Sequence, residues 1–286
     1  WFSLGATCFS HPLRFDKEVA DRFVLAAMLG HPIGLTGMQI AGATTPVTVA
    51  GFVAVSAAEY IATWIAGRAI NPSVPLRGSI WAATLDMRGG DASYSAPDAM
   101  LRAFALNEFL RRWCGFAVQV GGGEYSSAKV PGLYAALEKA YKALLIAAYA
   151  GEHPGVGQGM VETGKSISLV QLLLDHEMTT ALESLTQEIV VNDETIGMDA
   201  ILAVGHGLES NYLTTEHTLR HYRDNTWMPP FTDRSGYQGQ LTEEVALAKA
   251  RARIQEMLAQ YQKPERDPAV LERMRAVVER ARKELL

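Results

Sequence analysis

Three side chains that could take part in chemistry, Glu124, Tyr125 and Glu162, stand at or just after the carboxyl ends of two runs of residues typical of β-strands. The first run covers residues 116–120 and leads into the loop GGGEYSS, and the second covers residues 158–162. The ends of parallel strands carry the active site in a (β/α)₈ barrel, whatever the reaction. We therefore predict these three as catalytic residues, against the alternative that each is a solvated loop residue.

Other motifs favour structural interpretations. His217 and His221 are four residues apart on an expected helix and could share a metal ion, but Thr218 stands where the HExxH motif has glutamate. The glycines of residues 155–159 precede a strand instead of joining a strand to a helix, which favours a tight turn over a phosphate loop. No GxSxG, P-loop or kinase motif occurs. We predict no metal site.

The elements that must position these side chains alternate between short β-rich runs and helices, as in parallel βα units. The expected strands are residues 2–8, 38–43, 79–84, 116–120 and 158–162. The expected helices are residues 16–29, 45–66, 98–114, 131–150 and 168–185, and the charged amphipathic helices 242–261 and 267–286. A closed barrel has eight units over about 250 residues, whereas about five are visible here.

These patterns predict an α/β fold, the C-terminal portion of a TIM (β/α)₈ barrel with a helical C-terminal tail. Residues 1–240 form the partial barrel domain in this interpretation, and residues 241–286 form helices packed on it. The chain starts at Trp1 instead of methionine, so we expect it to lack an N-terminal part. An open barrel exposes an edge strand, which predicts association into a homo-oligomer.

Composition excludes several other classes. Lys and Arg number 26 against 31 Asp and Glu, and no basic stripe is interleaved with aromatics, so nucleic acid is not an expected partner. The cysteines Cys8 and Cys114 stand outside any CxxC motif, which favours a reducing, cytoplasmic setting. Residues 46–66 are long enough to span a bilayer, but they include Glu59 and many small residues. A buried core helix is favoured over a membrane span.

The segment AGATTPVTVAG at residues 41–51, followed by Ala58 and Glu59, resembles the trimethylamine methyltransferase (MttB) family. Further matching segments are GGGEYSSAK at 121–129, LLLDHEM at 172–178 and YLTTEHTLRHYRDNTWMP at 212–229. The resemblance covers nearly the whole chain. It implies a (β/α)₈ barrel that moves a methyl group from a methylated amine to the cobalt of a separate corrinoid protein.

This chain departs from the family pattern in two ways. Family members are longer at the N-terminus, and the trimethylamine enzymes carry pyrrolysine near the loop that here reads 121–127, where only standard residues stand. Members without pyrrolysine resemble the glycine betaine methyltransferases, which implies a quaternary amine as substrate. The chain has no DxHxxG motif, so we expect it to bind no cofactor itself and to meet the corrinoid on a partner protein.

A quaternary nitrogen is already cationic, so the implied site consists of aromatic faces and carboxylates. Glu124 and Glu162 are the expected carboxylates, and each aromatic candidate could instead be packing. The expected substrate-binding residues are Thr44, Tyr94, Gln158, Tyr212, His217 and Trp227. Alternatives are trimethylamine as substrate, a non-catalytic fragment that keeps only a corrinoid-protein docking surface, or a lyase with Lys129 or Lys165 as a Schiff-base amine.

Overall fold

The computed structural model describes residues 7–151, 156–237, 239 and 241–285. The chain divides into two compact units after Ala250. The first unit is mixed α/β, which confirms the predicted class, and the second contains the helix α10 (Pro268–Leu285). Most of the expected strand 2–8 and part of the glycine turn 155–159 lie outside the described residues.

Short parallel strands run through the middle of the first unit. They are β1 (Thr36–Gly37), β3 (Ser79–Ile80) and β6 (Gln119–Val120), in the order β1-β3-β6, with β2 (Ile40–Ala41) and β4 (Ala83–Asp86) forming a second parallel pair. The register places Gly37 opposite Ile80 and Ile80 opposite Val120. The chain therefore leaves these strands at one common level.

The fifth strand was predicted to pair in parallel with the other strands, and this prediction is wrong. The strand is β7 (Met160–Val161), which pairs antiparallel with β8 (Ser166–Ile167) across the short helix η1 (Glu162–Gly164). The left-handed backbone of Thr163, with φ of 58°, and of Gly164, with φ of 83°, turns the chain back on itself. A similar hairpin joins β4 to the antiparallel β5 (Asp91–Ser93).

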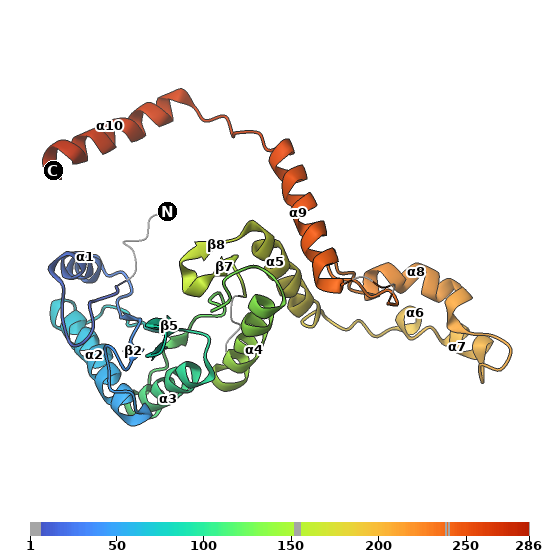
Figure 1. Ribbon diagram of the computed structural model, residues 1–286, viewed down its shortest axis with the longest axis horizontal. Coiled ribbons are helices and arrows are strands. Elements are labelled where there is room, and N and C mark those ends of the chain that lie inside the picture. Colours follow the sequence, from blue (N-terminus) through green and yellow to red (C-terminus); the bar gives the residue numbers. More distant parts are fainter. Residues whose placement is uncertain (1–6, 152–155, 238, 240, 286) are drawn as a thin grey trace. The chain divides into compact units, whose positions relative to one another are not determined.

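Five helices of the first unit correspond to predicted ones, four of them within two residues at each end and the second, predicted at 45–66, displaced by four residues. Figure 1 shows α1 to α4 following one another around the strands. The five helices are α1 (Lys17–Met28), α2 (Val49–Ile70), α3 (Pro97–Cys114), α4 (Leu133–Ala150) and α5 (Leu169–Ser184). The predicted start of α2 at Thr45 is wrong, because the Thr48 side chain accepts the Gly51 N–H at 3.3 Å and caps the helix there.

Helix α2 is long and apolar enough to cross a membrane, with mean hydropathy 1.5, yet it packs in the core of this unit. Phe52 and Tyr60 have no exposed surface. Tyr60 Oη donates to the Ser79 carbonyl at 2.6 Å, and Trp64 Nε1 donates to the Arg77 carbonyl at 2.8 Å. The helix is therefore tied to β3 by hydrogen bonds, as expected of a core helix.

The later part of the chain is helical with short loops. Its elements are α6 (Asp193–Ile196), α7 (Met198–Val204), η2 (Tyr212–Thr214), α8 (Glu216–Asn225) and α9 (Thr242–Gln260). The predicted charged helices 242–261 and 267–286 correspond to α9 and α10, each within two residues at its ends.

A buried ion pair joins α4 to α5. Lys139 Nζ lies 2.6 Å from Asp175 Oδ2, and the two side chains are 0% and 1% exposed. The carboxylate also accepts the Gly159 N–H at 2.9 Å and the Gln171 side-chain amide at 2.7 Å. Gln171 in turn accepts the Gly132 N–H at 3.0 Å. The charge of Asp175 is therefore fully coordinated within the protein, which is the condition for keeping it buried.

Lys139→Met should lower the free energy of unfolding of the full-length protein by about 3–5 kcal/mol, because it leaves the Asp175 charge buried without its partner. Urea unfolding measures the change. Lys17→Met removes a lysine from the exposed Lys17–Asp21 pair and should leave the unfolding midpoint near that of the wild type. Equal shifts in the two variants would contradict a structural role for the buried pair.

Candidate functional site

The loop after β6 approaches the neighbouring strand very closely. A side chain at Gly121 would place its Cβ 2.3 Å from the Trp81 ring, so the backbone fits there only as glycine. Trp81 Nε1 donates to Glu124 Oε1 at 2.7 Å. Trp81, which the sequence did not single out, thus fixes one predicted catalytic carboxylate at the exit of β3.

Tyr94 and Tyr125 stack on one another, with ring centroids 4.9 Å apart and planes inclined by 27°. The Ser95 hydroxyl donates to the Tyr125 carbonyl at 3.0 Å, and a Cβ at Gly164 would lie 2.5 Å from the Tyr125 ring. Burial is the main cause that raises the pKa of both phenols, so the rings are neutral at physiological pH. A neutral tyrosine face attracts cations.

A buried lysine of α4 completes this cluster. Lys142 Nζ donates to the Tyr94 carbonyl and lies 6.0 Å from the centroid of the Tyr125 ring. Burial lowers the pKa of Lys142 to about 8, although the charges of Glu124 and Glu138 act in the opposite direction. The group therefore changes its charge close to physiological pH.

Sequence reasoning missed Lys142, although its spacing carried a signal. Ala135, Lys139, Lys142 and Ile146 recur at intervals of four, three and four residues, and all four are buried in α4. That spacing places them on one face of a helix. Two lysines on the stripe of a helix that faces the core indicate partnered or functional charges, because lysine is almost never fully buried alone.

The backbone of Glu162 lies beside the same loop, while its carboxylate has another partner. The N–H groups of Glu162 and Thr163 donate to the carbonyls of Ala128 and Ser126, each at 2.7 Å. The Glu162 carboxylate accepts the Ser166 hydroxyl at 3.1 Å, within its own hairpin. The structure thus brings Tyr94, Tyr125 and Glu124 together and places Glu162 next to them through its backbone.

Two predicted substrate-binding residues form turns. The Thr44 hydroxyl accepts the Ile40 N–H at 2.9 Å and closes the turn that follows β2. Gln158 is exposed and has a left-handed backbone, with φ of 68°, just before β7. Both positions are thus explained by turns in the backbone, and the role of these two residues in binding remains a prediction.

Tyr212 and His217 belong to η2 and α8. Tyr212 is 48% exposed. His217 Nε2 lies 3.1 Å from the Glu194 carbonyl oxygen, and the rings of His217 and His221 are 4.5 Å apart. Both histidines line a polar cavity of about 690 Å³. Among the residues that the structure describes, no group of three or more His, Cys, Asp or Glu side chains is placed to hold a metal ion.

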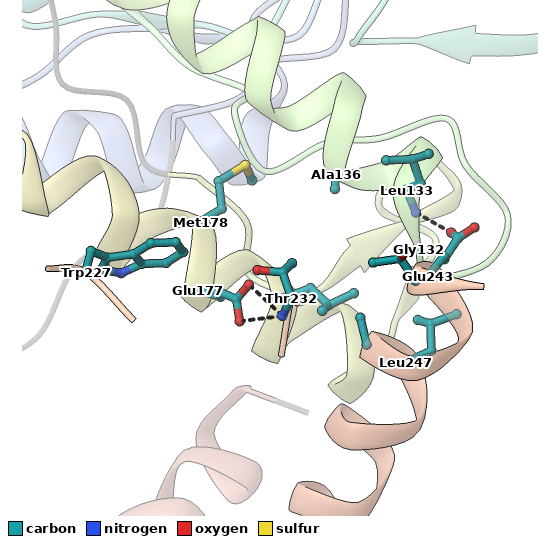
Figure 2. Close-up of a pocket in the computed structure, with 12 residues that line it drawn as sticks. Gly132, Leu133, Ala136, Glu177, Met178, Trp227, Thr232, Glu243 and Leu247 are labelled. Carbon is teal, nitrogen blue, oxygen red and sulfur yellow. Dashed lines mark hydrogen bonds between the residues drawn. The ribbon is translucent and has the colours of Figure 1, made fainter. Parts of the chain in front are cut away.

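Trp227 lines an apolar cavity of about 410 Å³ between α4, α5 and the first turns of α9, and Figure 2 shows its ring flanking the cavity beside Met178. The Glu177 carboxylate accepts the Phe231 N–H at 2.6 Å and the Thr232 N–H at 3.2 Å. Glu177 is therefore engaged by the backbone, and the cavity offers mainly apolar contact.

Aromatic and charged side chains are thus gathered where parallel strands of this α/β unit end, which is where α/β folds commonly place their ligand sites. The family model described as "Trimethylamine methyltransferase (MTTB)" matches residues 5–285. The chain belongs to this family, as its sequence motifs predicted.

The names of curated relatives mention two kinds of substrate, trimethylamine and glycine betaine. The chain is 28% identical over 277 residues to trimethylamine methyltransferase MttB2 of Methanosarcina mazei, covering 96% of this chain and 54% of the relative. It is 26% identical over 280 residues to glycine betaine methyltransferase of Desulfitobacterium hafniense, covering 96% of this chain and 57% of the relative. It is 27% identical over 279 residues, 96% of this chain and 55% of the relative, to trimethylamine methyltransferase MttB of Methanosarcina barkeri. The chain thus spans about half the length of these relatives.

The depressed pKa of Lys142 predicts a stability that depends on pH. Between pH 8 and 10.5 the unfolded chain binds a proton that native Lys142 has lost, so this group makes the free energy of unfolding rise with pH over that window. The slope is at most about 1.4 kcal/mol per pH unit. In Lys142→Met this contribution should be absent, and urea unfolding at pH 7 to 10 measures it.

Lys129→Met serves as the matched control, because the Lys129 side chain is 60% exposed. Its stability profile should run parallel to that of the wild type. A Lys142→Met profile that also runs parallel to the wild type would show that Lys142 titrates like an exposed lysine.

Proposed function

We propose that this chain is part of a corrinoid-dependent methyltransferase that moves a methyl group from a quaternary amine, such as a betaine, to the Co(I) of a partner corrinoid protein. Family membership and relatives named for trimethylamine and glycine betaine support the reaction class. The observation that carries the proposal is the Tyr94–Tyr125 stack beside Glu124.

The architecture that we propose for this function is a partial (β/α)₈ barrel in residues 1–240 with C-terminal helices in residues 241–286. The shared register of β1, β3 and β6 supports it, because parallel strands linked by helices are the unit of such barrels. The catalytic side chains would then stand at the barrel mouth, where the loop that carries Tyr125 leaves β6.

In this proposal the protein binds and orients the amine, and the corrinoid on the partner supplies Co(I), the nucleophile that receives the methyl group. A quaternary nitrogen leaves as a neutral amine, so no proton has to be delivered to it. The stacked rings would hold the cation by their faces. Glu124 would offset its charge at longer range, since Trp81 engages one carboxylate oxygen. Partial neutralisation keeps the methyl group electrophilic.

Trimethylamine is the alternative substrate, favoured by the names of relatives from Methanosarcina. It is a tertiary amine and has to be activated before it loses a methyl group, whereas the loop 121–127 contains only standard residues. The quaternary class therefore fits the residues of this chain better.

The full-length protein should methylate a cob(I)alamin carrier protein when supplied with betaines. The assay tests glycine betaine, other quaternary amines and trimethylamine as methyl donors. Methylation of Co(I) is measured by its absorbance change, which identifies the donor. Activity with trimethylamine alone would select the alternative substrate. A protein that binds the carrier but transfers no methyl group from any amine would instead be a docking fragment.

Tyr125→Ala in the full-length protein should raise KM for a betaine about 2-fold to 30-fold, because it removes a cation–π contact worth about 0.5–2 kcal/mol. The change in kcat should be smaller. Steady-state kinetics separates the two constants. Tyr222→Ala, at a 51% exposed tyrosine of α8, is the control and should leave both unchanged. A Tyr125→Ala protein with a normal KM and a reduced kcat would show that this ring is not part of the cation site.

We also propose that the protein works in the reducing cytoplasm and self-associates. Among the described residues Cys8 and Cys114 form no disulfide. Large apolar side chains are exposed on α3 and α4, with Trp113 at 69%, Leu137 at 58% and Leu144 at 61%. Exposed apolar faces of this kind support association between copies.

A further inference from the structure

The apolar cavity beside Trp227 lies where the chain enters α4. Gly132 precedes this helix and Leu133 begins it, after the loop that leaves β6 and carries Tyr125. Both residues line the cavity, whose volume of about 410 Å³ is that of a small-molecule pocket. The cavity shares no lining residue with the cluster around Tyr125, so it is a separate feature of the same unit.

The walls of the cavity offer aliphatic side chains and one aromatic ring. Leu174, Met178 and Leu247 are among the apolar lining residues, and Figure 2 shows the Trp227 ring beside Met178. Arg234 lies over the Trp227 ring with its guanidinium carbon 5.2 Å from the centroid, but it does not line the cavity. The indole is the aromatic group that attracts cations most strongly.

The charged side chains that line the cavity are both carboxylates. Glu177 is 4% exposed, and its carboxylate accepts the Phe231 and Thr232 N–H groups at 2.6 and 3.2 Å. Glu243 Oε1 accepts the Leu133 N–H at 2.6 Å. No lysine, arginine or histidine is among the lining residues.

Neither carboxylate has a cationic partner. Within the part of the chain that the structure describes, Glu177 and Glu243 form no ion pair. Backbone N–H groups satisfy their hydrogen bonds but carry no net charge, so the negative charge beside the apolar walls is not compensated. A cationic ligand would compensate it.

Charge and polarity together define the ligand class. An anion would meet two carboxylates and no cation. A metal ion would exchange its water for walls that are mainly apolar, which is costly. An ammonium ion with an apolar group satisfies both requirements, because its hydrocarbon part contacts the aliphatic side chains while its charge is attracted by the indole and the carboxylates.

We propose that this cavity binds small organic cations that carry an apolar group, such as alkyl or aryl ammonium ions. The apolar group contacts Leu174 and Leu247, and the ammonium group lies against Trp227. Glu177 and Glu243 offset its charge. This site is additional to the one proposed for the methyl donor at Tyr94 and Tyr125, and it does not depend on the proposed methyl transfer.

The experiment is isothermal titration of the full-length protein with benzyltrimethylammonium. This cation should bind with a Kd of about 1 mM or tighter, the range expected for a ligand of its size. Phenylacetate, an anion of similar size, should bind at least about tenfold more weakly, because it meets the two carboxylates. Binding of the cation should persist in Tyr125→Ala, which separates this cavity from the cluster around Tyr125.

Two variants test the groups assigned to the cation. Trp227→Leu should raise the Kd about 2-fold to 30-fold through loss of the indole face, and Trp113→Leu, at a 69% exposed tryptophan, is its control. Glu243→Gln keeps an oxygen that accepts the Leu133 N–H but removes the charge, and it should raise the Kd about 2-fold to 10-fold. Glu244→Gln removes the same charge one residue outside the lining and should leave the Kd unchanged.

Equal affinities for benzyltrimethylammonium and phenylacetate would overturn the proposal. A wild-type Kd in a folded Trp227→Leu or Glu243→Gln protein would also overturn it, as would complete loss of binding in Tyr125→Ala. Because Glu243 is an exposed residue of α9, the Glu243→Gln protein provides the test even where Trp227→Leu does not fold.

Discussion

The parallel register of β1, β3 and β6 is the constraint on which the functional part of this protein depends. It makes Gly37, Ile80 and Val120 neighbours, so the residues that follow them emerge together. The strands are only two residues long, and the loops after them carry the chemistry. A shift by one residue in this register would turn the side chains to the opposite face of the sheet. It would also separate Trp81 from Glu124, whose hydrogen bond joins adjacent strand exits.

Buried charges form a second layer of organisation around these exits. Lys139 is paired with Asp175, and Glu59 is surrounded by donors, so both satisfy the condition under which charge is tolerated in a protein interior. Lys142 differs, because its partner is a neutral carbonyl and the carboxylates act on it at longer range. Its lowered pKa follows from that difference. The charge of the cluster around Tyr125 can therefore change with pH through Lys142, whereas the Lys139–Asp175 pair between α4 and α5 has a structural role.

The sequence specified the elements well where its signals were local. The charged helices of the tail follow from their amphipathic periodicity, and α3 and α5 lie within one residue of the predicted ranges at each end. The start of α2 was misplaced because the sequence alone does not distinguish Thr45 from Thr48 as the residue that caps the helix. The pairing of β7 was missed because a left-handed backbone at Thr163, which is not a glycine, leaves no trace in the pattern.

By itself the sequence determined the mixed α/β class, the family and the loop in which Glu124 and Tyr125 stand, because motifs and hydrophobic periods are properties of contiguous residues. Tertiary structure decided which distant side chains meet. Trp81 reaches Glu124 across 43 positions, and His11 reaches Glu59 across 48. Lys142 acquires its lowered pKa only through burial and through groups supplied by other elements, whereas its spacing in α4 indicated a core-facing lysine and not those groups.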